Sequence, residues 1–343
     1  GTGGRGYADS TGALAGYRGS SAYISINEPN LNLVVNGNVT ARTGISGGYN
    51  NAIWTKSNIT FNNITINNTG IMYVAGNYNA TNINILGQFG AEALSSSLAL
   101  PPLGGNLDLI ATTINLSNRG KISVRGGDLT ANTVSIAGIA GKINITSTNF
   151  YLDGTINIEG GNWTSSGNGG GAAAGQLYMN ITNNLTINGN ISGQGGDGTN
   201  GCSGVSGSRG NGSTLDLRAS NIIVNGIINT RPSSNGGCNN AVWKYANIVT
   251  DKFSVVGVAY GNWTINANTV EIIGNLSSRA ASGIIAGYPM TNSSNIVINT
   301  TLFNLTSSGV LESQGATHTL NLLNVRPSKA GDIFITATTR VYN

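Results

Sequence analysis

Side chains that commonly carry catalysis or bind metals are scarce in this chain. Its 343 residues include one histidine, His318, two cysteines and 13 acidic residues. No set of His and Cys ligands, Ser-His-Asp arrangement or nucleotide-binding loop can be assembled from them. The glycine-rich stretch 193–197 also lacks the spacing and the lysine of a phosphate-binding loop. We therefore expect neither a metal nor another cofactor, and the sequence predicts a protein that is not an enzyme.

Acceptor motifs for N-linked glycans are, in contrast, abundant. The sequon Asn-x-Ser/Thr occurs 17 times, more often than the abundance of Asn, Ser and Thr alone predicts. In a secreted protein such asparagines carry bulky glycans at the surface. The alternative is that strands and corners rich in Asn and Thr produce sequons by accident. The predicted sites are Asn38, Asn58, Asn63, Asn67, Asn79, Asn115, Asn144, Asn162, Asn180, Asn184, Asn190, Asn211, Asn262, Asn275, Asn292, Asn299 and Asn304.

Two of these sequons enclose a tryptophan. The sequence Gly-Asn-Trp-Thr occurs at 161–164 and again at 261–264. Trp163 and Trp263 could stack on a sugar, but packing in the core or at a corner is the usual place for a tryptophan in a strand. We expect them in the core.

Cysteine placement points to the outside of the cell. Cys202 and Cys238 lie in glycine-rich segments that follow the same repeat element. They would project from one edge of neighbouring turns, so a disulfide between them is predicted, with two free thiols as the alternative. The chain begins at Gly1 without an apolar leader, as in a processed product or a trimmed chain. These features predict an extracellular or cell-surface location.

Charge and hydropathy argue against two other classes of protein. Only 9% of residues are charged, and the net charge of +4 is dispersed, so we expect no nucleic-acid partner. No stretch approaches 18 consecutive apolar residues, so we expect no membrane span. Because 39% of residues are apolar and they alternate regularly, the chain should form a packed body.

A short apolar motif recurs along most of the chain. Each copy has two apolar residues separated by one position, then a glycine two residues later, then another apolar residue two residues after the glycine. Examples are Leu33–Val39 and Leu185–Ile191. Such a short repeat cannot bury a core alone and must stack on its neighbours. Strand patterns precede the motif and helical periodicity is absent, so the sequence predicts an all-β solenoid. The residues expected in one continuous core include Leu33, Val35, Val39, Ile114, Leu116, Ile122, Leu185, Ile187 and Ile191.

Glycine-rich insertions separate some of the turns. The segments 167–175, 193–213 and 233–240 fall at one phase of the repeat, which predicts loops on one face of the solenoid. Asn-Gly corners at Asn36, Asn188 and Asn225 are expected to supply the positive φ of a sharp bend. We divide the chain into a glycine-rich N-terminal segment, 1–21, and a single β-helix domain, 22–343.

Taken together, these repeats resemble a right-handed parallel β-helix, in particular the repeats of filamentous haemagglutinin-like adhesins and other surface β-solenoids. The stretches 185–192 and 107–124 carry the resemblance, which covers residues 22–343. It implies right-handed coiling and a structural or adhesive protein of the cell surface, with surface carbohydrate as a possible partner. The chain departs from that pattern because it has no secretion-domain signature and many sequons.

Two other kinds of protein are alternatives to this interpretation. A β-helix polysaccharide lyase or glycoside hydrolase would need two carboxylates about 5–10 Å apart. Asp108 and Asp216 share a repeat phase, and Asp153 lies near Glu159, but the acids look evenly spread. A groove with three or more acids and a Lys or Arg would favour the enzyme. A β-sandwich pilin joined by donor strands is disfavoured by the short repeat.

The way the repeats end predicts how the protein assembles. Residues 331–341 align with a segment that begins at Gly105, but the chain stops at Asn343, partway through that turn. Neither end offers the polar capping element that an isolated solenoid needs. The sequence therefore predicts a head-to-tail homopolymer, with a fragment of a longer chain or caps formed by the terminal segments as alternatives.

Overall fold

The computed structural model describes residues 19–43, 53–96, 103–130, 136–164, 169–198, 209–233, 241–279, 292–315 and 329–342. Within these ranges every regular element is a β-strand, and all of the strands pair in parallel in two sheets. The predicted all-β solenoid is confirmed.

Long strands form one sheet, which we call the long sheet. They are β1 (Ser25–Val35), β3 (Ser57–Ile66), β5 (Gly76–Ile85), β7 (Leu107–Leu116), β9 (Lys142–Leu152), β11 (Gln176–Ile181), β12 (Asn184–Ile187), β14 (Thr214–Val224), β16 (Tyr245–Val255), β18 (Asn262–Ile272), β20 (Ile296–Leu305) and β22 (Ile333–Tyr342).

Strands of three residues form the other sheet, the short sheet. They are β2 (Asn38–Thr40), β4 (Ile71–Tyr73), β6 (Gln88–Gly90), β8 (Lys121–Ser123), β10 (Thr155–Asn157), β13 (Asn190–Ser192), β15 (Ile227–Asn229), β17 (Val258–Tyr260), β19 (Asn275–Ser277) and β21 (Val310–Glu312). One long strand and the short strand that follows it make one level of the stack, with β11 and β12 sharing a level.

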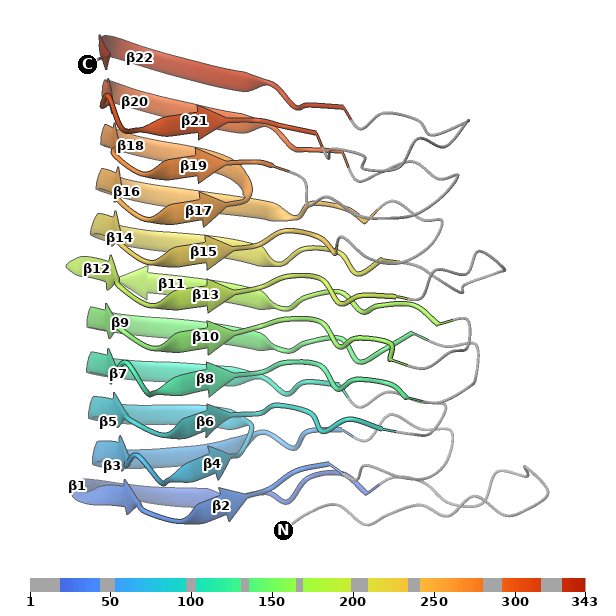
Figure 1. Cartoon of the computed structure of the whole chain (residues 1–343). Coiled ribbons are helices and arrows are strands. Elements are labelled where there is room, and N and C mark those ends of the chain that lie inside the picture. The colour runs from blue at the N-terminus through green and yellow to red at the C-terminus, as the bar shows by residue number, and fades with distance from the viewer. Residues whose placement is uncertain are drawn as a thin grey trace.

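The coil is right-handed, as the resemblance implied. In Figure 1 the short strands run to the right on the near side, the long strands return to the left behind them, and the chain climbs from N to C. Neighbouring levels are paired residue over residue, so like positions lie above like at about 4.8 Å per level.

The core is the column of apolar side chains between the two sheets. Alternate residues of each strand point inward, and Ile83, Ile114 and Phe150 are stacked in register and fully buried. The predicted core positions are confirmed, with one error and one partial case. Val39 is 36% exposed and Leu33 only half-buried, because both belong to the first level and no described residue covers them from below.

The motif glycine is required by the stacking and not by the bend. A Cβ on Gly189 would lie 1.9 Å from the carbonyl oxygen of Gly154, and one on Gly226 would lie 2.0 Å from that of Gly189. Among the described glycines, positive φ occurs at Gly76 and Gly90, away from the Asn-Gly corners, so the expected reason for these glycines was wrong. Close approach of successive backbones leaves no room for a side chain.

Paired extensions leave the stack from one side. After most short strands the chain runs out as an arm, such as 124–130, and returns along a second segment, such as 136–141, before the next long strand. The described parts of the three predicted insertions, 169–175, 193–198 with 209–213, and residue 233, all lie in such arms, which confirms their common face. Cys202, Cys238 and His318 lie outside the described residues.

Arms have a small core of their own and are missing at two levels. Leu129, Ala137, Trp163 and Ala172 form a second buried cluster. Two residues link β4 to β5, and Gly261 alone links β17 to β18, so no arm follows those short strands.

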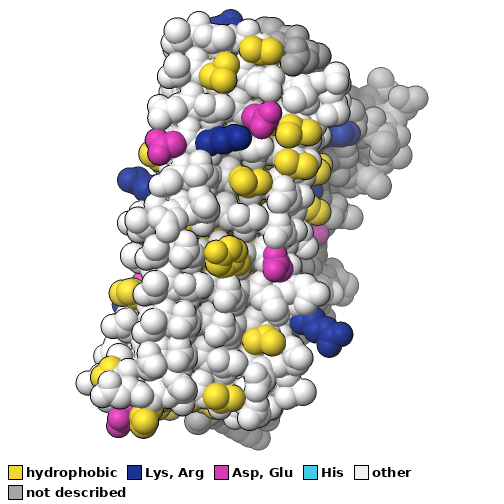
Figure 2. All heavy atoms as spheres, turned by 90° about the vertical axis from the view of Figure 1, so that its left-hand side faces the viewer, with side chains coloured by type: hydrophobic (Ala, Val, Ile, Leu, Met, Phe, Trp, Pro, Cys, Tyr) yellow, Lys and Arg dark blue, Asp and Glu magenta, His cyan; other side chains and the backbone are white. Residues whose placement is uncertain are grey.

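Figure 2 views the side on which the long strands end. Backbone and uncharged polar side chains make up most of this surface, and hydrophobic and charged side chains form only small groups on it. No helix in the described part of the chain is long and apolar enough to cross a membrane.

Candidate functional site

All 17 sequon asparagines lie in the described ranges, and none of them is buried. Nine are exposed and eight are half-buried. Seven of them donate their side-chain amide to a neighbour, mostly on the level below. Asn63 Nδ2, for example, lies 2.7 Å from Asn32 Oδ1, and Asn115 Nδ2 lies 3.0 Å from Asn84 Oδ1. The others that donate are Asn58, Asn67, Asn144, Asn299 and Asn304.

These amide ladders give the asparagines a structural role. A side-chain amide both donates and accepts, so one Asn stacked on another in a parallel sheet satisfies both. The corner asparagines do the same, since Asn225 Nδ2 lies 2.8 Å from Asn188 Oδ1 and Asn188 Nδ2 lies 2.7 Å from Asp153 Oδ1. Stacking therefore explains part of the sequon excess.

Trp163 and Trp263 are both core residues, as expected. Trp163 belongs to the arm core, and Trp263 is fully buried with its Nε1 3.3 Å from the carbonyl oxygen of Ser277.

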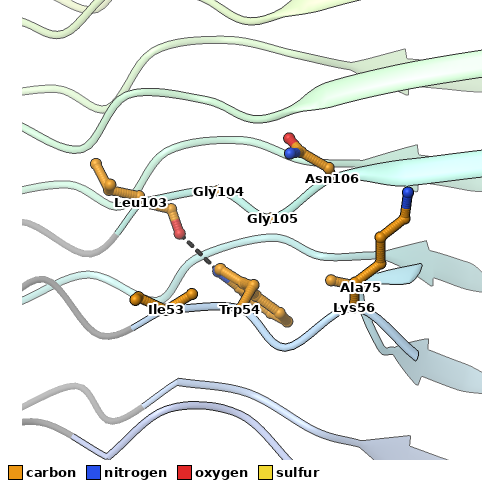
Figure 3. A pocket seen from close by; sticks show the side chains of 8 residues that line it. All are labelled: Ile53, Trp54, Lys56, Ala75, Leu103, Gly104, Gly105 and Asn106. Atoms are coloured by element: carbon orange, nitrogen blue, oxygen red, sulfur yellow. Dashed lines mark hydrogen bonds between the residues drawn. The ribbon is translucent and has the colours of Figure 1, made fainter. Parts of the chain in front are cut away.

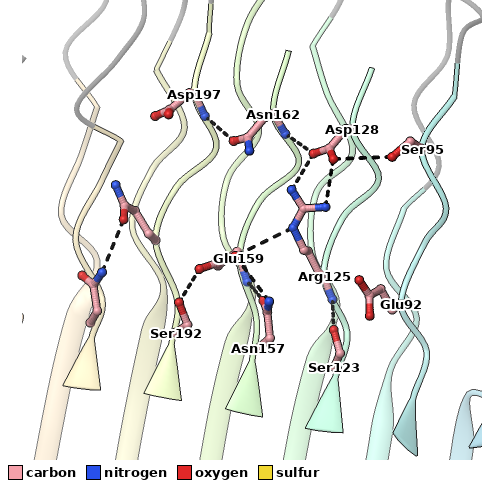
Figure 4. Close-up of polar contacts among 12 residues, drawn as sticks. Glu92, Ser95, Ser123, Arg125, Asp128, Asn157, Glu159, Asn162, Ser192 and Asp197 are labelled. Atoms are coloured by element: carbon pink, nitrogen blue, oxygen red, sulfur yellow. Dashed lines mark hydrogen bonds and ion pairs between the residues drawn. The ribbon is translucent and has the colours of Figure 1, made fainter. Parts of the chain in front are cut away.

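A cluster of acids and bases lies at the roots of the arms (Figure 4). Arg125 contacts Asp128 on its own arm at 2.5 Å and Glu159 on the next level at 3.8 Å. Lys121 pairs with Glu92 on the preceding level at 3.0 Å. Four of the 13 acids, Glu92, Asp128, Glu159 and Asp197, occupy this one edge, so the expectation of evenly spread acids was wrong.

Hydrogen bonds between levels hold the cluster in place. The backbone N–H of Asn162 donates to Asp128 Oδ1, and the backbone N–H of Asp197 donates to Asn162 Oδ1, each at 2.8 Å. Burial lowers the pKa of Arg125, but its hydrogen bond to Asp128 and the nearby carboxylates outweigh burial and raise that pKa overall. Within the described residues no three His, Cys, Asp or Glu side chains are placed to share a metal ion.

The other acids considered from sequence are not brought together with one another. Asp108 and Asp216 do share a column of the long sheet, but the levels of β9 and β11 separate them. Asp153 lies at the corner before β10, whereas Glu159 follows that strand at the root of an arm.

A pair of tryptophans that sequence reasoning missed marks the two levels without arms. Trp54 Nε1 donates to the carbonyl oxygen of Leu103 at 2.7 Å (Figure 3), and Trp243 Nε1 donates to that of Asn292 at 2.7 Å. At other levels the equivalent carbonyl oxygen accepts a hydrogen bond from a backbone N–H in the returning segment of the level below. Gly104 N thus bonds Ile139 O at 2.9 Å. The further pairs are Ser21–Ile53, Ala140–Ala173, Ala174–Asn211, Gly212–Val242 and Ser293–Lys329.

The indole therefore replaces an absent arm. Trp54 precedes β3 and Leu103 precedes β7, so the ring spans the level of β5 and its N–H takes the place of the missing amide. On the level of each tryptophan, an arginine from the level below lies over a tyrosine ring, Arg42 over Tyr73 at 3.9 Å and Arg231 over Tyr260 at 4.2 Å. Burial and the charge of Glu92 raise the pKa of Tyr73 to about 12.

An internal duplication in the sequence carries this signal. Gly-Gly-x-Asn-Asn-Ala-Ile/Val-Trp ends at Trp54 and again at Trp243, and an arginine lies 12 residues before each tryptophan. The levels of β1, β3 and β5 thus correspond to those of β14, β16 and β18. A search for repeats longer than one turn would have found it.

No protein-family model, curated protein or solved structure matches this chain. The comparisons therefore support no family assignment, and what the structure supports is a right-handed β-solenoid.

Proposed function

We propose that this protein is a secreted, non-enzymatic β-solenoid, a structural and adhesive glycoprotein of the cell surface, and that copies join head to tail in a filament. The observation that carries the proposal is a pair of opposite charges at the two open ends of the stack. Secretion and cell-surface location rest on the sequons and the predicted disulfide.

No strand in the described part of the chain pairs with the outer edge of β1 or of β22. Apolar side chains continue the core to each end, with Ile26 and Leu33 on β1 and Ile335 on β22 only half-buried. Unpaired backbone groups beside exposed core favour association with another strand.

At each end of the long sheet, a charged residue of the outermost strand pairs in register with a buried phenylalanine of the neighbouring strand. Glu28 of β1 is in register with Phe61, and Arg340 of β22 is in register with Phe303. The Arg340 guanidinium donates to the carbonyl oxygen of Ile335 at 2.6 Å. Followed through the sheet, the column of Arg340 leads to Leu33 and not to Glu28, so a joint between unlike ends brings the acid and the base to one interface without stacking them directly. Like ends would bring equal charges together instead. A contact between unlike ends does not close, so it propagates.

Charge reversal tests this assembly. We expect the wild-type chain to form rods that lengthen with concentration, and Glu28→Arg or Arg340→Glu to shorten them to single units, measured by sedimentation velocity and electron microscopy. The double variant Glu28→Arg/Arg340→Glu should restore the rods because it restores the opposite charges. A wild-type chain that stays monomeric at every concentration, or a double variant no better than the single ones, would reject the filament.

Glycan occupancy should follow the free side-chain amides. Asn79, Asn180 and Asn190 are exposed and make no hydrogen bond to a described residue through Nδ2, the atom that carries the sugar, so we expect glycans there. Asn63 and Asn115 use Nδ2 within a ladder and should be bare. Glycopeptide mass spectrometry of native material gives the occupancies. An intact mass of 35.1 kDa would contradict glycosylation altogether.

A polysaccharide lyase or glycoside hydrolase is the second candidate function, and the arm-root cluster is the observation that favours it. The carboxylates of Asp128 and Glu159 both contact the guanidinium of Arg125. Glycoside hydrolysis uses a pair of carboxylates that flank the scissile bond, and this cluster offers such a pair beside a cation. Release of reducing ends or unsaturated products from polysaccharides, abolished by Glu159→Gln and retained by Glu271→Gln outside the cluster, would establish it. No release from a broad panel of polysaccharides would leave the cluster with its structural role.

A further inference from the structure

We infer that the corner between the arms and the long sheet binds an extended acidic polysaccharide that lies along the axis of the solenoid. Two hollows of about 220 and 380 Å³ lie in this corner, and they share Leu103, Gly104 and Asn106, so they form one groove. The groove crosses the levels from β3 to β11, which at about 4.8 Å per level is roughly 19 Å.

Small residues of the returning arms form the floor of the groove, because the stacked backbones leave no room there for larger side chains. A Cβ on Gly141 would lie 1.9 Å from the carbonyl oxygen of Gly105. Exposed aliphatic side chains, Ile53 and Ile139, line the arm side. Amide side chains, Asn106 and Gln176, line the sheet side. Figure 3 shows the hollow that Trp54 lines, at one end of the groove.

The lining selects a sugar chain over a peptide. Amides can donate and accept hydrogen bonds with sugar hydroxyls, and the aliphatic wall can pack against the apolar faces of sugar rings. A peptide lying along the axis would cross the strands at right angles. The strand backbones are already paired between levels and could not add it to the sheet.

Charge on the sheet side favours an acidic polymer. Lys142 lies with its ammonium 4.5 Å from the centre of the Tyr178 ring, and no described carboxylate is within ion-pair distance of it. Asp108, whose carboxylate feels the charge of Lys142, is already paired with Lys56 at 2.6 Å. Burial raises the pKa of Asp108, but the hydrogen bonds from Lys56 and Asn144 lower it by more, so the pKa lies below its ordinary value. This acid therefore stays ionised, and Lys56 neutralises its charge. A uronate or sulfate would thus meet one uncompensated cation.

This inference deepens the adhesive part of the proposed function and is independent of filament assembly. Binding of a decamer of galacturonic acid is measured by calorimetry on the whole chain, as wild type and as the charge-reversed Arg340→Glu variant. We expect equal binding by the two chains whether or not polymers form. Binding should weaken as salt is raised, because the contact is partly ionic.

Variants locate the binding. Lys142→Gln should weaken it about fivefold, and Asn106→Trp should abolish it by filling the groove, while Lys252→Gln, at an exposed lysine outside the groove, should not change it. The inference is overturned by no binding, by equal losses for Lys142→Gln and Lys252→Gln, or by equal affinity for a neutral cellulose oligomer. Equal affinity for poly-glutamate would overturn the choice of a sugar chain.

Discussion

Replacing Gly189 with alanine is expected to destabilise the solenoid by more than about 3 kcal/mol, since the added methyl group has nowhere to go. A Cβ there would lie 1.9 Å from the carbonyl oxygen of Gly154 and within 2.6 Å of a second backbone oxygen. Both contacts are with backbone, so no side chain can move aside. The levels on either side would have to separate, which breaks the ladder between β10 and β13.

Gly37 provides a matched control for this experiment. It holds the same motif position on the first level, and a Cβ there would meet no atom within 4 Å. Gly37→Ala should therefore change stability by less than about 1 kcal/mol, and reduced freedom of the unfolded chain favours a small gain. Guanidinium unfolding of the two variants measures the difference. Similar losses at both positions would show that the corner and not the stacking demands glycine.

Trp243→Ala should lower the free energy of unfolding by about 3–5 kcal/mol, because it empties the space of an absent arm and leaves a carbonyl without its donor. Trp243 is 8% exposed and bonds Asn292 across the level of β18. Trp54→Ala should cost less, since Trp54 is only half-buried.

A conservative variant separates packing from hydrogen bonding. Trp243→Phe keeps an aromatic ring but removes the N–H, so we expect a loss of about 1–3 kcal/mol from the orphaned carbonyl of Asn292. Thermal unfolding and hydrogen exchange at the amides of residues 292–295 report the effect. A Trp243→Phe chain as stable as the wild type would show that the indole only fills space.

The resemblance to adhesin repeats was helpful at the level of architecture. It implied a right-handed parallel coil, and the structure has one. Secretion, adhesion and polymerisation remain proposals, and the experiments above separate them because each has its own readout.

The sequence by itself determined the direction of the side chains and the spacing of the levels. Alternation of apolar and polar residues sorts each strand into an inner and an outer face, because successive side chains of a strand point to opposite sides. The recurring glycine marks each level. Ile114, Leu116 and Ile187 were therefore predictable as core residues, and they are fully buried or nearly so.

Only the tertiary structure decided which residues meet between levels. The partners in the arm-root cluster and the indole bridges lie 29 to 49 residues apart where they cross levels. Their meeting depends on the lengths of the intervening arms, which no local pattern encodes. The corner glycines are another example, because the carbonyl oxygen of the level below leaves no room for a side chain there. Val39 is a third, because it is exposed only through its position on the first described level. Stacking places residues from different turns in contact, and a one-turn motif carries no information on what lies above or below it.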